Sequence, residues 1–381
     1  MSSAAEFSWN EMVPLDDLVA SGEVQLGRGN VISKIDIRNN PGPYPIYSSS
    51  SKNGGKMGEY GSFMFDEELI SWSVDGGGYF FHRPKHKFSV TNVSGYMRLS
   101  HEWDYRFTAY SLQFQHEYFS FDYQTKAHPS VIREFYLFPK VTLPEQQKIA
   151  TILSSVDDVI EKTRAQIDKL KDLKTGMMQE LLTKGIGHTE FKNSAMGRVP
   201  KDWSVKTLGE TATLQRGHDL TQANSVVGCY PVVSSSGVSA MHDEYTTQGP
   251  GVVVGRKGSI GRVHYIQSDF WAHDTSLYVT NFHGNDVLFI YQLFSWLDLQ
   301  KYGTKSGSPS LNRNDLHPLK LALPPVAEQI EIRDVLMQVD ERTSLLRRKL
   351  SHLTGLKKAL MQDLLTGKVR VNVDQKEPAA A

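Results

Sequence analysis

A chain of 381 residues, 39% of them apolar, is long enough for more than one hydrophobic core, and at ~100 to 200 residues per domain it predicts two or three domains. Its 42 basic and 42 acidic side chains balance, so no bulk charge indicates nucleic acid or an anionic membrane as a partner. One cysteine, Cys229, excludes an internal disulfide and is expected to be a buried small side chain. The sequence has no apolar run of about 18 residues and no signal-peptide pattern, which predicts a soluble, cytoplasmic protein.

The chain repeats itself over nearly its whole length. The stretch YPIYSSS from Tyr44 returns as YPVVSSS from Tyr230, and EQQKIATILSSVDD from Glu145 returns 183 positions later as EQIEIRDVLMQVDE from Glu328. The second match continues to MQELLTKG and MQDLLTGK, and weaker echoes pair LGRGNVIS with LQRGHDLT and HPSVIR with SPSLNR. We therefore interpret the chain as two copies of one unit.

Each copy begins with a globular part, expected over residues 1–142 and 188–322. The first contains GSFMFDEELISWSVDGGGYFF, and the second contains GPGVVVGRKGSIGRVHYI. Both stretches mix aromatic and β-branched residues with glycine and serine. Short runs of this kind predict strands joined by turns.

Each copy ends in one long helix, expected over residues 143–187 and 323–367, and a frayed tail is expected over 368–381. Glycine almost vanishes in these segments, and apolar residues recur at helical spacing. Pro144 suits the first turn of the first helix, the glycines of KGIG suit its end, and Gly367 suits the end of the second. About 39 helical residues at 1.5 Å each give a rod of ~58 Å.

A rod of that length is longer than a domain of ~140 residues, whose radius of gyration is ~14 Å. Packing of the two rods on each other is therefore favoured over packing of each rod on its own globular part, and a duplicated chain would pair them antiparallel about a pseudo-twofold axis. The expected fold class is α+β, with two mixed α/β domains separated by two long helices packed as an antiparallel coiled coil. The expected packing positions are Ile149, Val156, Ile160, Ile167, Leu170, Ile332, Val339, Leu346, Leu353 and Leu360.

In their order and doubling, these motifs resemble the specificity subunit of type I restriction-modification systems. The resemblance rests on TLPEQQKIATILSSVDDVIEKTRAQIDKLKDLKTGMMQELLTKG from Thr142, GRVPKDWSVKTLGE from Gly197, GRKGSIG from Gly255 and GSPSLNRNDLHPLKLALPP from Gly307. It covers essentially the whole chain. It implies two target-recognition domains, residues 1–142 and 188–322, that alternate with two helical spacers.

The resemblance also implies a non-catalytic subunit that reads a bipartite, asymmetric sequence in double-stranded DNA, one half with each target-recognition domain. Two methyltransferase subunits and the restriction (translocase-nuclease) subunits would assemble on it. The S-adenosylmethionine site would belong to the methyltransferase, so no cofactor, catalytic residue or metal is expected here. The sequence agrees, because it has no NPPF or DPPY motif, no glycine-rich cofactor loop after a strand and no GxxxxGK[ST] loop. Since the net charge is zero, we expect weak DNA binding in the absence of partners.

DNA recognition needs cations for phosphates, and forked donors or amides for base edges. The second globular part offers GRKGSIG, whereas the first has Asp75 at the corresponding place and its cations later, so the two parts should read different sequences. The candidates are Arg28, Ser48, Ser49, Ser50, Lys52, Asn53, Lys56, Arg83, Lys85, Arg216, Ser234, Ser235, Ser236, Arg256, Lys257, Arg262 and Lys305. For each serine a turn-capping role is an equal alternative, and for Arg28 and Arg216 a solvated surface position is.

Three alternatives stay open at this point. One is the specificity subunit of a related system, in which nuclease and methyltransferase share one partner chain. A second is a carbohydrate-active enzyme, which would need a pair of acidic residues in a cleft. A third is a coiled-coil adaptor that binds only proteins, which would leave the two diverged globular parts without a role.

Overall fold

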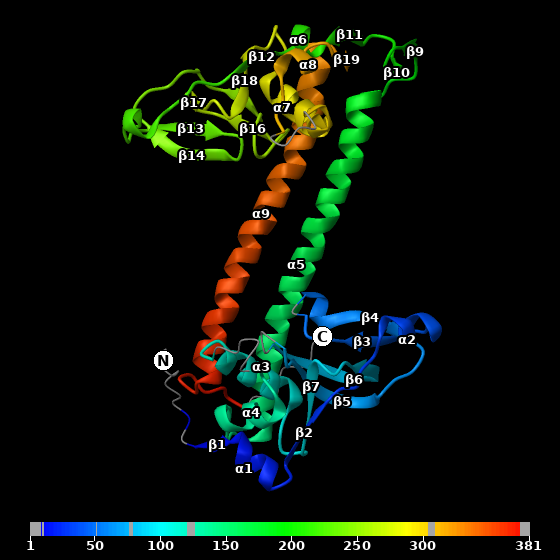
Figure 1. Cartoon of the computed structure of the whole chain (residues 1–381), viewed down its shortest axis with the longest axis vertical. Coiled ribbons are helices and arrows are strands. Elements are labelled where there is room, and N and C mark those ends of the chain that lie inside the picture. The colour runs from blue at the N-terminus through cyan, green and yellow to red at the C-terminus, as the bar shows by residue number, and fades with distance from the viewer. Residues whose placement is uncertain are drawn as a thin grey trace. The chain divides into compact units, whose positions relative to one another are not determined.

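The computed structural model describes residue 9 and residues 11–50, 52–75, 79–119, 126–303 and 309–373. The expected contact at Lys305 and most of the expected tail, residues 374–381, lie outside them. The chain forms two compact units. Unit 1 comprises Met1–Arg164 with Lys349–Ala381, and unit 2 comprises Ala165–Arg348 (Figure 1).

Two long helices each contribute to both units. Helix α5 spans Leu143–Lys184 and α9 spans Val326–Leu365, which are 42 and 40 residues. Pro144 lies in the first turn of α5, and Gly185 follows its end with φ of 69°, a left-handed conformation that favours glycine. In the part of the chain that the structure describes, no helix combines the length and apolarity needed to cross a membrane.

Within each unit the two helix segments run antiparallel. In unit 1, Ile149 of α5 shares a core with Leu364 of α9, and further along α5 Asp157 pairs with Lys357 at 2.7 Å. Rising residue numbers in one helix therefore meet falling numbers in the other. Unit 2 repeats this order, because Lys174 pairs with Asp340 at 2.7 Å, and beyond that pair Met178 and Leu182 of α5 share a core with Ile332 and Leu336 of α9.

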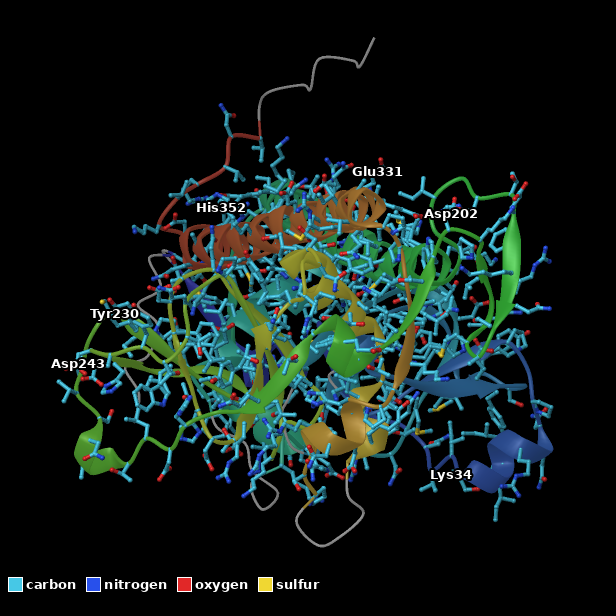
Figure 2. The ribbon with its side chains drawn as sticks, turned by 90° about the horizontal axis from the view of Figure 1, so that it is seen from above. Lys34, Asp202, Tyr230, Asp243, Glu331 and His352 are labelled. Carbon is cyan, nitrogen blue, oxygen red and sulfur yellow. The ribbon has the colours of Figure 1, made fainter. Side chains whose placement is uncertain are left out.

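The apolar stripes of both helices face inward. Of the expected packing positions, Ile149, Ile160, Ile167, Ile332 and Val339 are buried, and Val156, Leu170, Leu346, Leu353 and Leu360 are half-buried. Apart from the ion pairs between the helices, many charged side chains lie exposed, and Glu331 and His352 on α9 are examples (Figure 2). The helix ends also pack on the globular parts, so both packing modes weighed from the sequence occur.

The globular part of unit 1, here called head 1, is built on one six-stranded sheet in the order β2-β7-β5-β6-β3-β4, with a separate β1-β8 pair. Its strands are β1 (Met12–Pro14), β2 (Val24–Arg28), β3 (Tyr44–Tyr47), β4 (Lys56–Tyr60), β5 (Phe65–Ser73), β6 (Phe80–Val90), β7 (Ser94–Leu99) and β8 (Leu137–Pro139). Its helices are α1 (Leu15–Ala20), α2 (Lys34–Asn39), α3 (Tyr105–His116) and α4 (Pro129–Phe135), with a 3-10 turn at Lys52–Gly55.

The globular part of unit 2, here called head 2, divides the equivalent strands between a four-stranded sheet, β12-β18-β15-β16, and a three-stranded sheet, β14-β13-β17. The strands are β11 (Ser204–Thr207), β12 (Thr213–Arg216), β13 (Tyr230–Ser234), β14 (Gly237–His242), β15 (Gly251–Gly255), β16 (Val263–Ile266), β17 (Trp271–Ala272), β18 (Ser276–Asn281) and β19 (Lys320–Leu323), preceded by the hairpin β9 (Phe191–Ser194) and β10 (Gly197–Pro200). The helices are α6 (Leu208–Thr211), α7 (Val287–Trp296) and α8 (Arg313–Leu316), with 3-10 turns at Gln222–Asn224 and Leu299–Tyr302.

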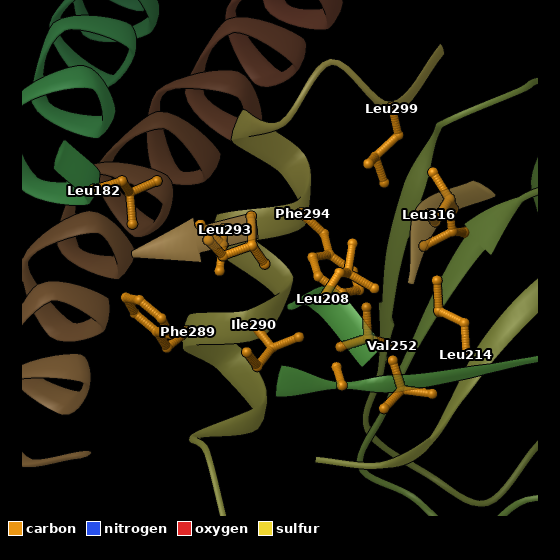
Figure 3. Close-up of a cluster of buried hydrophobic side chains, with 14 of the residues drawn as sticks. Leu182, Leu208, Leu214, Val252, Phe289, Ile290, Leu293, Phe294, Leu299 and Leu316 are labelled. Atoms are coloured by element: carbon orange, nitrogen blue, oxygen red, sulfur yellow. The ribbon is translucent and has the colours of Figure 1, made fainter. Parts of the chain in front are cut away.

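The core of head 2 connects the sheet to the long helices. Phe289 and Leu293 of α7 lie between Leu182 of α5 and strand residues such as Leu214 and Val252 (Figure 3). All five side chains are at most 4% exposed. Since each fully buried side chain of this size contributes about 1.5–3 kcal/mol, this core fixes the head to its end of the helix pair.

The two heads share their backbone plan. Strand β3 pairs antiparallel with β4 and parallel with β6, and β13 pairs antiparallel with β14 and parallel with β17. The repeated Tyr-Pro-Ser stretch forms these strands, with a bulge after Ile46 in one and after Val232 in the other. The repeated Arg-Gly pair lies beside them, where a Cβ on Gly29 or Gly217 would overlap a neighbouring carbonyl oxygen. Both duplications therefore have a structural cause.

Candidate nucleic-acid interface

The loop of residues 255–262, which follows β15, is the clearest candidate for contact with DNA. Its backbone folds tightly, since Gly255 N–H donates to the Arg262 carbonyl at 2.7 Å and Gly261 N–H to the Gly255 carbonyl at 2.9 Å. Gly258 and Gly261 have positive φ of 73° and 74°. Lys257 and Arg262 are exposed on this loop, as a phosphate contact requires. Both side chains are accessible to a ligand, and their DNA contacts stay predictions.

Arg256, in the same loop, faces a hollow of about 670 Å³ on head 2. The hollow is also lined by Arg216 and His218 at the end of β12, and by Asn312 and Arg313 at the start of α8. The structure thus brings Arg216 and Arg256 together, although they are 40 positions apart in the sequence. The sequence analysis did not select His218 or Arg313. The only available signal was that Arg313 lies in the SPSLNR echo.

The three arginines of the hollow outnumber the carboxylates near them, which are Asp219 in the lining and Asp274 beside Arg216. Arg216 donates to Asp274 at 3.0 Å, but its side chain is 58% exposed, which makes this a weak pair. Burial and the nearby Arg216 lower the pKa of Arg256, and Asp274 only partly opposes this. The Nε of Arg256 is buried without a hydrogen-bond partner. Such a site favours an anion.

The serines of the repeated stretch have mixed surroundings. Ser48 accepts a hydrogen bond from Thr91 at 3.1 Å, and Ser50 accepts one from Lys52 N–H at 3.1 Å. In head 2, Ser234 donates to the Gly237 carbonyl at 3.0 Å. The bonds of Ser50 and Ser234 lie within turns, which is the alternative that the sequence left open, whereas the Ser48 bond joins the residues that follow β3 and β6. Ser235 is buried, Ser236 is exposed and Ser49 is half-buried, so the predicted DNA contacts of the serines stay predictions.

The candidate cations of head 1 are more dispersed. Arg28 donates to the Asn92 carbonyl through Nε at 3.2 Å and Nη2 at 2.5 Å. Lys52 and Asn53 are exposed on the 3-10 turn, and Lys85 is exposed on β6. Lys56 is also exposed but pairs with Glu59 at 2.8 Å. Lys52, Asn53 and Lys56 thus lie on or next to the turn, while Lys85 lies on β6.

Arg83 differs from the expectation of an exposed cation. Its side chain is buried, its Nε donates to Ser71 Oγ at 2.8 Å, and its Nη2 donates to the Gly54 carbonyl at 2.7 Å. The guanidinium lies 3.6 Å from the centre of the Tyr47 ring, and burial lowers the pKa of Arg83 to about 10. Arg83 therefore positions the turn that carries Lys52 and Asn53, because β6 directs it inward.

The cysteine and two of the histidines have surroundings that bear on reactive or metal chemistry. Cys229 is exposed, so the expectation of a buried cysteine is wrong; it lies in the irregular stretch just before β13. Within the described residues, no three His, Cys, Asp or Glu side chains gather as a metal site would need. His82 instead contacts Glu68 at 2.6 Å, and His86 contacts the Pro84 carbonyl at 2.6 Å.

Comparison with known families adds one match. The model of the type I restriction modification DNA specificity domain matches this chain twice, over residues 9–172 and 200–354. The two matches correspond to the two copies seen in the sequence. They include both heads and most of both long helices.

Known relatives extend this match. The chain is 26% identical over 336 residues to the type I restriction enzyme MjaVIII specificity subunit of Methanocaldococcus jannaschii, covering 80% of this chain and 79% of that protein. It is 27% identical over 257 residues to a provisionally assigned MjaX specificity subunit of the same organism, and this match spans only 59% of that protein. Among solved structures, the S subunit of a type I restriction-modification system from M. genitalium has the same fold, with a TM-score of 0.67, 19% identity and coverage of 96% and 98% of the two chains.

Proposed function

This chain belongs to the family of type I restriction-modification DNA specificity domains, and from that premise we propose that each head recognises one half of a two-part DNA sequence. The chain is a recognition component and not a catalyst. Chemistry on the DNA is the task of partner subunits.

One observation carries this proposal: at an equivalent backbone position, the two heads keep the hydrogen bonding of the chain and change the side chains. Val74 N–H donates to the Val93 carbonyl at 3.0 Å, and Arg256 N–H donates to the Thr275 carbonyl at 2.9 Å. The next residues are Asp75 and Lys257, of opposite charge. Two domains tuned to different half-sites need this kind of divergence.

The partners follow from the family. We expect two methyltransferase subunits, which hold S-adenosylmethionine, and restriction subunits that join the assembly in the cytoplasm beside the cellular DNA. The long helices would space the two half-sites. Because 42 basic side chains are balanced by 42 acidic ones, the chain alone should bind DNA weakly and the partners should supply further phosphate contacts.

The proposal is tested by selecting random DNA duplexes with the purified chain, alone and together with its methyltransferase, and sequencing what is retained. Recovery of a two-part motif with a fixed gap, chiefly when the methyltransferase is present, is the expected result. If neither sample retains any motif, the chain does not read DNA, and an adaptor that binds only proteins becomes the better account.

A further inference from the structure

We propose that the hollow lined by Arg216, Arg256 and Arg313 in head 2 binds one phosphate group of the DNA backbone, and that head 1 has no equivalent site. This inference rests on the proposed function and adds to it a ligand class and an asymmetry. It concerns a single contact that fixes one head on the duplex, not the reading of a base.

The charge of the hollow calls for an anion. Arg216 forms an ion pair with Asp274, whereas Arg256 and Arg313 form no ion pair in the described part of the chain. Three arginines and one carboxylate, Asp219, thus line this space, and Asp274 lies beside it on Arg216, so cations outnumber carboxylates by three to two. Like charges held together in a partly desolvated place are unfavourable unless a bound anion offsets them.

A phosphate fits this space better than a base edge. A phosphodiester carries a full negative charge and two free oxygens, which suit forked guanidinium donors. A guanine edge can engage one arginine fork but carries no charge, so it would leave the remaining cations without compensation. The Nε of Arg256 is buried without a hydrogen-bond partner, so this arginine keeps a donor that the protein leaves unpaired.

Head 1 fills the equivalent place differently. Ala127 N–H donates to the Val74 carbonyl at 3.0 Å, as Leu311 N–H donates to the Arg256 carbonyl at 2.9 Å, so Val74 occupies the position of Arg256. Beside it, Lys126 pairs with Asp75 at 2.9 Å. The fork of Arg28, which corresponds to Arg216, is bound to the Asn92 carbonyl. The anion site is therefore a property of head 2.

The test uses the chain assembled with its methyltransferase and compares the wild type with Arg256→Gln and Arg313→Gln. A lost phosphate contact should weaken binding to the cognate duplex and to an unrelated duplex by the same factor, roughly three to ten. It should also reduce the slope of log affinity against log salt by about one. Arg198→Gln removes an exposed arginine of head 2 that stacks on Phe191 and does not line the hollow, and it should change neither quantity.

A second arm locates the phosphate. Duplexes with a single uncharged methylphosphonate linkage, moved along the half-site, should show one position that weakens wild-type binding but not the binding of Arg256→Gln. The variant should melt at the same or a higher temperature, because it loses a poorly compensated charge. A loss confined to one base-pair identity would instead assign the hollow to base reading, and unchanged affinity and slope would remove it from the interface.

These outcomes are separable from failure of the proposed function. If the wild-type complex selects a two-part motif and the arginine variants behave like the wild type, only the phosphate site is wrong. If the wild-type complex selects no motif at all, the proposed function fails and the phosphate site fails with it.

Discussion

Arginines of the same formal charge have opposite roles in the two heads. Arg83 is enclosed by Tyr47, Ser71 and the Gly54 carbonyl, whereas Arg256 lines an open hollow and its Nε has no hydrogen-bond partner. The difference arises from backbone placement, because a strand directs one arginine inward and a glycine-rich loop leaves the other half-buried at the edge of the hollow. A buried, hydrogen-bonded cation supports structure, and an uncompensated one at the surface favours a ligand.

Arg83 should matter for stability rather than for direct contact with DNA. We expect Arg83→Ala to lower the free energy of unfolding by about 1–3 kcal/mol, since it leaves the Gly54 carbonyl and Ser71 hydroxyl without their donor. The measurement is urea denaturation of the full chain. Lys85→Ala, at an exposed position of the same strand, should stay within about 0.5 kcal/mol. Equal effects of the two changes would contradict a positioning role for Arg83.

His317 should make head 2 sensitive to acid. Its Nε2 accepts a hydrogen bond from Leu214 N–H at 3.0 Å, and burial together with the nearby Arg313 lowers the pKa of His317 below 6.5. The folded state thus binds this proton less tightly than the unfolded chain, so stability present at higher pH is lost as the pH falls through about 6.5. The urea midpoint should drop between pH 7.5 and 5.5, and His317→Gln should reduce that drop. The exposed His352 (Figure 2) offers the control, and a drop that His352→Gln reduces equally would argue against this assignment.

At the scale of elements, the repeated Glu-Gln pair that opens each helix match has a structural explanation. Gln146 accepts from Asp104 N–H at 2.8 Å and Gln329 from Asp286 N–H at 3.0 Å, at the N-caps of α3 and α7. These glutamines anchor each head to the first turn of a long helix.

The neighbouring glutamates hold the chain that leaves the other long helix. Glu145 binds Arg370 through both oxygens, at 2.7 and 2.6 Å. Glu328 accepts from His188 at 2.8 Å and from the Trp203 indole at 2.9 Å. In unit 1, Glu145 therefore holds the few residues that follow α9. In unit 2, Glu328 holds the longer connection that follows α5 in the same way.

The ion pairs between the helices should also contribute to stability. Asp157 accepts from Lys357 and from the Tyr110 hydroxyl, the latter at 2.6 Å, and both carboxylate and ammonium are largely shielded from solvent. Asp157→Ala should cost about 2 kcal/mol, because it leaves the ammonium and the hydroxyl without their acceptor. Thermal or urea unfolding of the full chain measures this. Asp158→Ala changes the exposed adjacent carboxylate and should be nearly neutral; a similar loss in both variants would show that the pair does not stabilise the helices.

The sequence predicted the elements with strong periodicity and missed those set by tertiary contacts. The long helices follow from their apolar repeat, and α5 begins at the expected residue 143 and ends at residue 184, three residues before the expected 187. The match of HPSVIR with SPSLNR pairs His128 with Ser308 in the sequence. In the structure, the equivalent helix N-caps are His128 and Asn312, so the sequence match has the wrong register. The burial of Arg83 could not be predicted from the sequence either, because a bulge between Glu67 and Leu69 shifts the pairing of β5 with β6.

At the scale of the whole molecule, duplication explains why one chain can recognise a sequence without internal symmetry. Both units use the same head plan, the same glutamine anchor and the same antiparallel helix pair, so each can be understood by itself. Divergence is concentrated where a ligand would approach, with Val74 in one head and Arg256 in the other. Two heads on one chain can then impose two different half-sites.

The most direct test of this account is to exchange one head and sequence the sites methylated by the assembled complex. Residues 204–323, from β11 to β19, would be replaced by the equivalent segment of a relative with a different target, and residues 12–139 would be exchanged in a matched second variant. The account predicts that each exchange changes one half of the motif and leaves the other half intact. A single exchange that alters both halves, or neither, would contradict the assignment of one half-site to each head.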